Sequence, residues 1–270
     1  MYRLGLVKKR LTAVVPLPLS FDWTVGPGGL PRVRDSQGEE IVLASPARYG
    51  LYRRGVVRRY EELVDQYGLQ QFLTPDCAVF VDVGANIGEF GKAIQWEGLS
   101  SRYIAFEPDP LAFTALSKNN PDAANLNIAL ADYTGRSKLF LASATADSSL
   151  HQPTTQHQGW ADVRVDTLDN SLNSFGLEEI SILKVEAEGG EPEVLAGAAK
   201  TLRRTRVCVV DAGPELHGTS TAPGCISILA NAGFELVDLR FPRGILVFQN
   251  TSFNTRSSPS RLRNLTTNGG

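Results

Sequence analysis

The sequence predicts an α/β protein built on a doubly wound, mostly parallel sheet with one antiparallel strand. Three observations predict it. Apolar strand patterns alternate with helical patterns from Cys77 onward. A glycine-spaced turn follows the buried strand at 78–83, as in sheets that bind ligands at their strand ends. Strands at 234–239 and 245–248 are joined by a link too short for a parallel crossover, so they must pair antiparallel.

Residues 1–70 are expected to form an N-terminal cap of irregular and short β segments followed by a helix. Val56, Tyr60 and Leu63 recur at helical spacing, which predicts a helix from about residue 52 to 67. Gly68 follows the last turn, where glycine commonly ends a helix.

Residues 71–250 are expected to form the main domain, with a small β insertion at about 133–170. The alternating pattern predicts strands at 78–83, 102–106, 125–130, 180–185 and 207–210, and helices at 87–97, from 110, 191–202 and 223–232. Residues 251–270 are polar and rich in Ser, Asn and Thr, which predicts a disordered tail.

The composition argues against a nucleic-acid-binding protein and against a membrane-spanning protein. The 270 residues are 42% hydrophobic and 21% charged, with a formal net charge of −2, which gives no support for a broad nucleic-acid-binding surface. No apolar run has the length needed to span a bilayer. Three cysteines without metal-type spacing predict core thiols and a cytoplasmic protein. Arginines 53, 54, 58 and 59 form either a solvated helix face or an attractor for an anionic substrate.

The turn after the first core strand has the pattern D-x-G-x-N-x-G, with Asp82, Gly84, Asn86 and Gly88. An aspartate beside this loop would repel a pyrophosphate and attract a cationic centre. Gly84, Gly88 and Asn86 tolerate positive φ, and the loop amides remain free to hold a carboxylate. A ligand with a cation, an amine, a carboxylate and a ribose fits, and S-adenosylmethionine has all four. The alternative is an ordinary tight turn with an incidental acid.

A second carboxylate follows the next strand. Glu107 comes directly after the apolar segment 102–106 and is followed by Pro108. A carboxylate at this strand end can accept hydrogen bonds from both ribose hydroxyls, and it would do so equally in a dinucleotide enzyme.

The strand at 180–185 ends in an unusual run of charges. Lys184, Glu186 and Glu188 share one face if the chain stays extended, which is costly unless the charges are paired or used. Lys184 would polarise a substrate hydroxyl, and Glu186, Glu188 or His217 would accept its proton. Two alternatives remain open: an ion pair that only stabilises the strand exit, and a Mg²⁺ site that includes Asp211.

In combination these segments resemble the FkbM family of S-adenosylmethionine-dependent methyltransferases from about residue 50 to 250. The matching segments are 81–88 (VDVGANIG), 105–109 (AFEPD), 165–169 (VDTLD), 183–191 (LKVEAEGGE) and 194–198 (VLAGA). The resemblance implies a seven-stranded class I methyltransferase fold, which is Rossmann-like, and methyl transfer to a hydroxyl of a sugar, glycan or other small molecule.

The resemblance also implies roles for particular residues. Those expected at the cofactor are Asp82, Gly84, Ala85, Asn86, Gly88, Glu107 and Pro108, with Asp132 as an adenine neighbour. Family members usually carry Lys-Ile-Asp-Val-Glu-Gly where this chain has residues 184–189, KVEAEG. Glu186 therefore adds a methylene, which moves its carboxylate by about 1 Å.

Two other functions are compatible with parts of the pattern. A nicotinamide-dependent sugar oxidoreductase or epimerase would share the sheet and Glu107, although Asp82 and Asn86 do not suit a pyrophosphate. A cofactor-binding protein without turnover is the second, because of Glu186. No pattern indicates the acceptor, the oligomeric state or a metal requirement.

Overall fold

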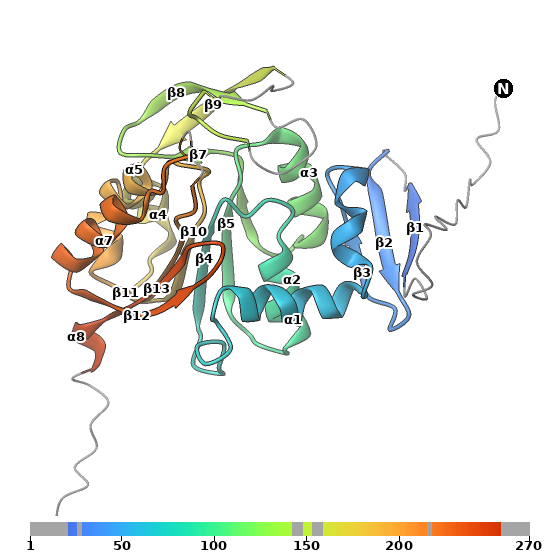
Figure 1. The fold of residues 1–270 in the computed structure, drawn as a ribbon, viewed down its shortest axis with the longest axis horizontal. Helices are drawn as coiled ribbons and strands as arrows, with labels where there is room; N and C mark the ends of the chain where they lie inside the picture. Colours follow the sequence, from blue (N-terminus) through green and yellow to red (C-terminus); the bar gives the residue numbers. More distant parts are fainter. Residues whose placement is uncertain are drawn as a thin grey trace, which may run out of the picture.

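The computed structural model describes residues 21–25, 29–141, 148–152, 159–214, 216 and 218–254. Its centre is a seven-stranded sheet in the order β12-β13-β11-β10-β4-β5-β6 (Figure 1). The strands are β4 (Val79–Val83), β5 (Arg102–Phe106), β6 (Ala124–Leu126), β10 (Ile180–Val185), β11 (Thr205–Asp211), β12 (Phe234–Arg240) and β13 (Ile245–Asn250). Strand β13 runs antiparallel to the other six strands of this sheet. The predicted fold class is confirmed.

Helices cover both faces of the sheet because successive strand residues point to opposite sides. The helices are α2 (Glu89–Trp96), α3 (Pro110–Asn119), α4 (Leu168–Leu172), α5 (Glu191–Ala196), α6 (Ala199–Leu202) and α7 (Ala222–Asn231). Phe80 and Ile182 pack with α2 and α3, whereas Val81 and Leu183 pack with α4 to α7. Two apolar cores result, and the three buried cysteines belong to them.

The N-terminal segment packs on the α2 and α3 side of the sheet (Figure 1). It consists of a separate antiparallel sheet, β1 (Phe21–Val25), β2 (Pro31–Asp35) and β3 (Glu40–Val42), a 3₁₀ helix, η1 (Pro46–Tyr52), and α1 (Val56–Gln66). Helix α1 begins later than predicted because Gly55 has φ 105° and the Asp35 carboxylate accepts hydrogen bonds from the amides of Val56 and Val57.

The prediction of a single strand at 125–130 is wrong. This segment contains two strands, β6 and β7 (Ala129–Leu130), which pair with different strands. The reason is Asn127, whose side-chain amide donates to the carbonyls of Glu107 and Pro108 and so turns the chain away from the sheet.

The insertion forms its own small sheet over the strand ends. Strands β8 (Gly135–Phe140) and β9 (Trp160–Asp166) pair antiparallel, as expected, and β7 pairs parallel with β9. A 3₁₀ turn, η2 (Asn173–Phe175), leads from α4 toward β10. The predicted disordered tail starts with a short helix, α8 (Thr251–Asn254), and residues 255–270 lie outside the described residues.

No helix in the described part of the chain has both the length and the apolar character that crossing a membrane requires.

Candidate functional site

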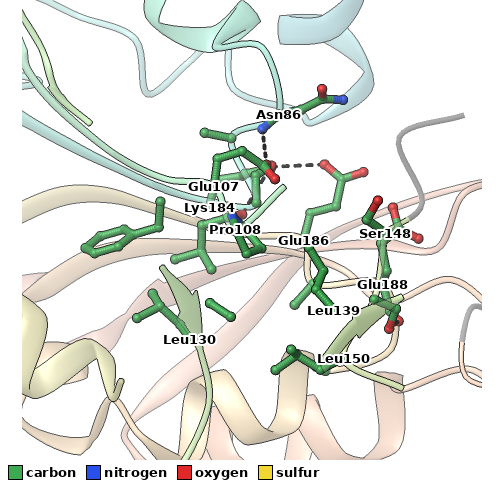
Figure 2. Close-up of a pocket in the computed structure, with 18 of the residues that line it drawn as sticks. Asn86, Glu107, Pro108, Leu130, Leu139, Ser148, Leu150, Lys184, Glu186 and Glu188 are labelled. Carbon is green, nitrogen blue, oxygen red and sulfur yellow. Dashed lines mark hydrogen bonds and ion pairs between the residues drawn. The ribbon is translucent and has the colours of Figure 1, made fainter. Parts of the chain in front are cut away.

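A cavity of about 880 Å³ opens at the carboxyl ends of β4, β5 and β10 (Figure 2). Ligands of open α/β sheets bind at this edge. The insertion supplies one wall through Leu139, Ser149 and Leu150, and the N-terminal segment supplies another through Arg48 and Arg59. The volume suits a cofactor-sized ligand together with part of a second molecule.

The predicted glycine turn lines the cavity through Gly84, Ala85 and Asn86. Gly84 has φ 69°, and a Cβ on it would lie 1.8 Å from the Glu186 carbonyl oxygen. Asn86 has φ 51°, which asparagine tolerates better than most residues. Gly88 faces α3 rather than the cavity, where a Cβ would lie 2.1 Å from Nδ2 of Asn120. The turn therefore requires its glycines for close packing as well as for conformation.

Glu107 and Pro108 lie in the cavity wall beside this turn, as predicted. The Glu107 carboxylate accepts hydrogen bonds from the backbone amides of Asn86 (2.6 Å) and Asp109 (2.8 Å). Burial raises the pKa of Glu107 to about 7, although these two amides oppose the shift. Each carboxylate oxygen keeps a lone pair for a further donor, so the group suits a ribose diol.

Asp82 does not face the cavity, which corrects the prediction of direct contact with a cationic centre. Its side chain is fully buried beneath the turn, and it is absent from the cavity wall. One carboxylate oxygen lies 3.0 Å from Nζ of Lys184, and the other accepts a 2.5 Å hydrogen bond from the Tyr103 hydroxyl. Asp82 acts on the cavity only through the groups that it holds.

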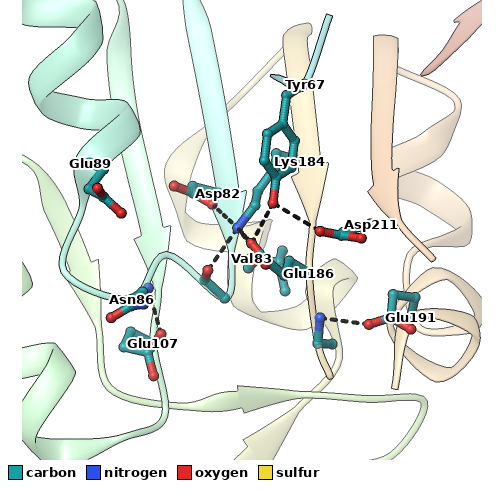
Figure 3. Close-up of polar contacts among 12 residues, drawn as sticks. Tyr67, Asp82, Val83, Asn86, Glu89, Glu107, Lys184, Glu186, Glu191 and Asp211 are labelled. Carbon is teal, nitrogen blue, oxygen red and sulfur yellow. Dashed lines mark hydrogen bonds and ion pairs between the residues drawn. The ribbon is translucent and has the colours of Figure 1, made fainter. Parts of the chain in front are cut away.

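Lys184 holds the turn through hydrogen bonds to its backbone carbonyls (Figure 3). Its Nζ donates to the carbonyl oxygens of Val83 (3.2 Å) and Gly84 (2.7 Å) and lies 3.0 Å from carboxylate oxygens of both Asp82 and Glu186. Burial alone would lower the pKa of Lys184, but the two carboxylates outweigh burial and raise it above its ordinary value. Lys184 therefore stays protonated and cannot act as a base at neutral pH.

Glu186 is bound on both oxygens. Tyr67 donates to one at 2.7 Å, and Arg243 donates to the other at 2.8 Å. Arg243 also binds the buried Asp211, which accepts a 3.3 Å hydrogen bond from Tyr67. Burial opposes ionisation of Glu186, but Lys184 and Arg243 prevail and lower its pKa to about 2. The predicted role of Glu186 as proton acceptor does not fit so weak a base.

The predicted common face of Lys184, Glu186 and Glu188 ends before Glu188. Strand β10 stops at Val185, and Glu188 has φ 50°, so side chains no longer alternate there. Glu188 still lines the cavity, and its carbonyl accepts a 2.7 Å hydrogen bond from the Ser149 hydroxyl. Ser148 donates to Asp109 at 2.9 Å, so the segment 148–152 connects the ends of β5 and β10 across the site.

His151 is in the same segment and lines the cavity, with Nε2 3.7 Å from a carboxylate oxygen of Glu193 in α5. His217 lies outside the described residues. Asp132 is exposed and absent from the cavity wall, although its neighbours Ala131 and Tyr133 line it. Its predicted position beside adenine stays a prediction.

Sequence reasoning missed a second ion network at the cavity. Glu89, in the first turn of α2, accepts hydrogen bonds from Tyr52 (2.7 Å), Arg59 (2.8 Å) and Arg48 (3.3 Å). Burial opposes its ionisation, but the two arginines lower the pKa of Glu89 to about 2. No spacing in the sequence links residues 48, 59 and 89. The one sequence feature that could have indicated this network is the carboxylate of Glu89 directly after the glycine turn.

The Mg²⁺ alternative has no support in the described residues. They contain no group of three or more His, Cys, Asp or Glu side chains arranged to hold a metal ion. The carboxylates considered for it, Glu186 and Asp211, both bind Arg243.

The family model described as "Methyltransferase FkbM domain" matches residues 82–236. The 2-O-methyltransferase NoeI of Sinorhizobium fredii is 24% identical over 227 residues, 77% of this chain and 92% of NoeI. The hexuronic acid methyltransferase AglP of Haloferax volcanii is 28% identical over 137 residues, 49% of this chain and 55% of AglP. Among solved structures, Streptomyces venezuelae DesVI is 13% identical, with a TM-score of 0.42 and coverage of 72% of this chain and 92% of DesVI.

Proposed function

The chain belongs to the FkbM family of S-adenosylmethionine-dependent methyltransferases, and from this premise we propose that it methylates a hydroxyl oxygen of a sugar or glycan. The names of two relatives support this acceptor: 2-O-methyltransferase NoeI supports transfer to an oxygen, and hexuronic acid methyltransferase AglP supports a sugar. Family membership removes the basis for a nicotinamide-dependent oxidoreductase. The observation that carries the proposal is the cavity shared by the glycine turn, Glu107 and the N-terminal wall.

The residues at one end of the cavity fit the cofactor. Glu107 would accept the ribose hydroxyls, and the backbone at Gly84 to Asn86 can approach a ligand closely because no Cβ stands at Gly84. Pro108 and Leu130 offer apolar surface to a purine. When bound, S-adenosylmethionine supplies an electrophilic methyl group on a positively charged sulfur.

The chain must then position the acceptor and remove its proton. Holding the hydroxyl in line with the methyl group supplies most of the rate enhancement. His151 is the one histidine among the described residues, and it is our candidate for proton acceptance. It lines the cavity, and its Nε2 lies 3.7 Å from a carboxylate oxygen of Glu193. Lys184 and Glu186 instead hold the turn and the strand end in place.

Cofactor binding is the first test of this function. S-Adenosylhomocysteine should raise the melting temperature of the intact protein, and Glu107→Ala should abolish the shift. No shift for the intact protein would contradict the assignment of the site.

Labelled-methyl transfer over a panel of sugars is the second test. His151→Asn should lower kcat by about 10² or more while affinity for S-adenosylhomocysteine is unchanged. Unchanged kcat in this variant removes His151 from the mechanism. Cofactor binding without transfer to any acceptor favours the alternative of a protein without turnover.

A further inference from the structure

Two arginines from the N-terminal segment line the cavity close to one another. Arg48 comes from η1 and Arg59 from α1, and both bind the same carboxylate, Glu89. Their side chains are only 14% and 12% exposed. Two guanidinium groups therefore share one anion at the cavity wall, and one positive charge is left in excess.

The hydrogen-bonding capacity of these arginines is only partly used. A guanidinium carries five N–H donors. Arg48 reaches Glu89 through Nη2 alone (3.3 Å), and its buried Nε has no hydrogen-bond partner among the described residues. Arg59 uses Nε (2.8 Å) and Nη2 (3.5 Å), both on Glu89. Nη1 of each arginine makes no hydrogen bond to a described residue, which leaves it available to a ligand.

The neighbouring arginines behave differently. Arg54 and Arg58 extend into solvent and pair with Glu61 or Glu62, outside the cavity. The arginines at 53, 54 and 58 are therefore exposed to solvent, whereas Arg59 lines the cavity. Arg59 and Arg48 come from different elements and both line the cavity, which distinguishes them from the arginines that are only surface charges.

We propose that Arg48 and Arg59 form an anion subsite for the methyl acceptor, so that the acceptor is a sugar bearing a carboxylate or a phosphate. This inference rests on the proposed function and specifies its substrate class. Planar guanidinium groups match such oxyanions with paired hydrogen bonds. Asn86 and Glu107 follow β4 and β5, whereas the two arginines come from η1 and α1 of the N-terminal segment, and we assign the arginines to the second ligand.

Calorimetric titration of matched sugars tests the subsite. The full chain, saturated with S-adenosylhomocysteine, is titrated with methyl glucoside, methyl glucuronide and glucose 6-phosphate. We expect at least one charged sugar to bind about tenfold more tightly than the glucoside at low salt, and the preference to shrink as salt rises. The two charged probes distinguish a carboxylate acceptor from a phosphorylated one.

Arg48→Gln should remove the charge preference, and Arg48→Lys should restore part of it. Glu89 keeps Arg59 and Tyr52 as partners in both variants, so the fold is expected to survive, which circular dichroism checks. Arg54→Gln is the matched control, because Arg54 is exposed and pairs with Glu62 outside the cavity. It should retain the full preference.

Three results would overturn the inference. The first is that neither charged sugar binds more tightly than methyl glucoside, while S-adenosylhomocysteine still binds. The second is an unchanged preference in Arg48→Gln. The third is weaker S-adenosylhomocysteine binding in Arg48→Gln, which would assign the arginine to the cofactor. Absence of S-adenosylhomocysteine binding by the intact protein contradicts the proposed function itself, and the inference with it.

Discussion

The two ion networks at the cavity have opposite charge balance. At the sheet edge, Lys184 and Arg243 are matched by three carboxylates, Asp82, Glu186 and Asp211. At the N-terminal wall, two arginines share Glu89. The first network has more carboxylates than cations, and its Lys184 holds backbone carbonyls, so it serves positioning. The second has arginine donors that make no hydrogen bond to a described residue, and both arginines line the cavity, so it can serve a ligand. Burial of charge alone does not distinguish a structural network from a binding site, but the balance of donors and acceptors does.

Removing Lys184 should have the largest effect. Lys184→Met leaves Asp82 and Glu186 without their shared cation in a buried position, which costs about 4 kcal/mol of unfolding free energy. Urea denaturation measures it, with Lys118→Met on the exposed face of α3 as control. A loss below about 1 kcal/mol would show that the sheet-edge network is not the structural one.

Glu89→Gln should cost less, about 2 kcal/mol, because Arg48 and Arg59 border the cavity and can be solvated there. The pKa of Glu89 is lowered from 4.5 to about 2, so its stabilisation is present above pH 4.5 and is lost as the pH falls toward 2. The difference in unfolding free energy between Glu89→Gln and the parent protein should therefore narrow over that range. Glu61→Gln, exposed on α1, is the control, and a pH-independent difference would contradict the ion pairs.

Glu107 adds a third case to the comparison of the two ion networks, because it forms no ion pair with a described residue. Glu107 is held by backbone amides, and its pKa is raised to about 7, whereas Glu89 and Glu186 have pKa values of about 2. If the ionised form binds the ribose, affinity for S-adenosylhomocysteine should fall about tenfold for each pH unit below 7 and level off above it. Titration calorimetry at pH 5.5 to 8.5 measures this. A flat profile would mean that the neutral acid binds equally well.

The smallest expected effect concerns the contact between the N-terminal segment and the sheet-edge network. Tyr67→Phe removes hydrogen bonds to Glu186 and Asp211 and should cost about 1 kcal/mol. Tyr60→Phe is the matched control, since the buried Tyr60 hydroxyl has no hydrogen-bond partner among the described residues. Equal losses in the two variants would show that the Tyr67 hydroxyl contributes nothing specific.

Much of the sheet and part of the site could be predicted from local sequence. Apolar runs predicted most strands, and the short link between the last two strands predicted their antiparallel pairing. Glycine spacing predicted the turn at Gly84, and the end of an apolar run predicted the position of Glu107. Each of these features depends on residues that are close in the sequence. The division at Asn127 escaped prediction because it depends on a side chain bonding to carbonyls of residues 107 and 108.

The interior position of Asp82 also escaped prediction, because it depends on Tyr103 and on Lys184, which is 102 positions further along the chain. Arg48, Arg59 and Arg243 reach the site from segments whose packing no local pattern encodes.

The pairing of Lys184 with Asp82 has a consequence for how the sheet is assembled. These residues lie directly opposite one another in the parallel pair of β10 and β4. Sliding β10 by one position would place Leu183 or Val185 opposite Asp82. The Asp82 carboxylate would then be buried in an apolar interior without a cation. Apolar side chains on either side would accept several alignments, so this one ionic contact excludes misaligned forms of the two central strands while the chain folds.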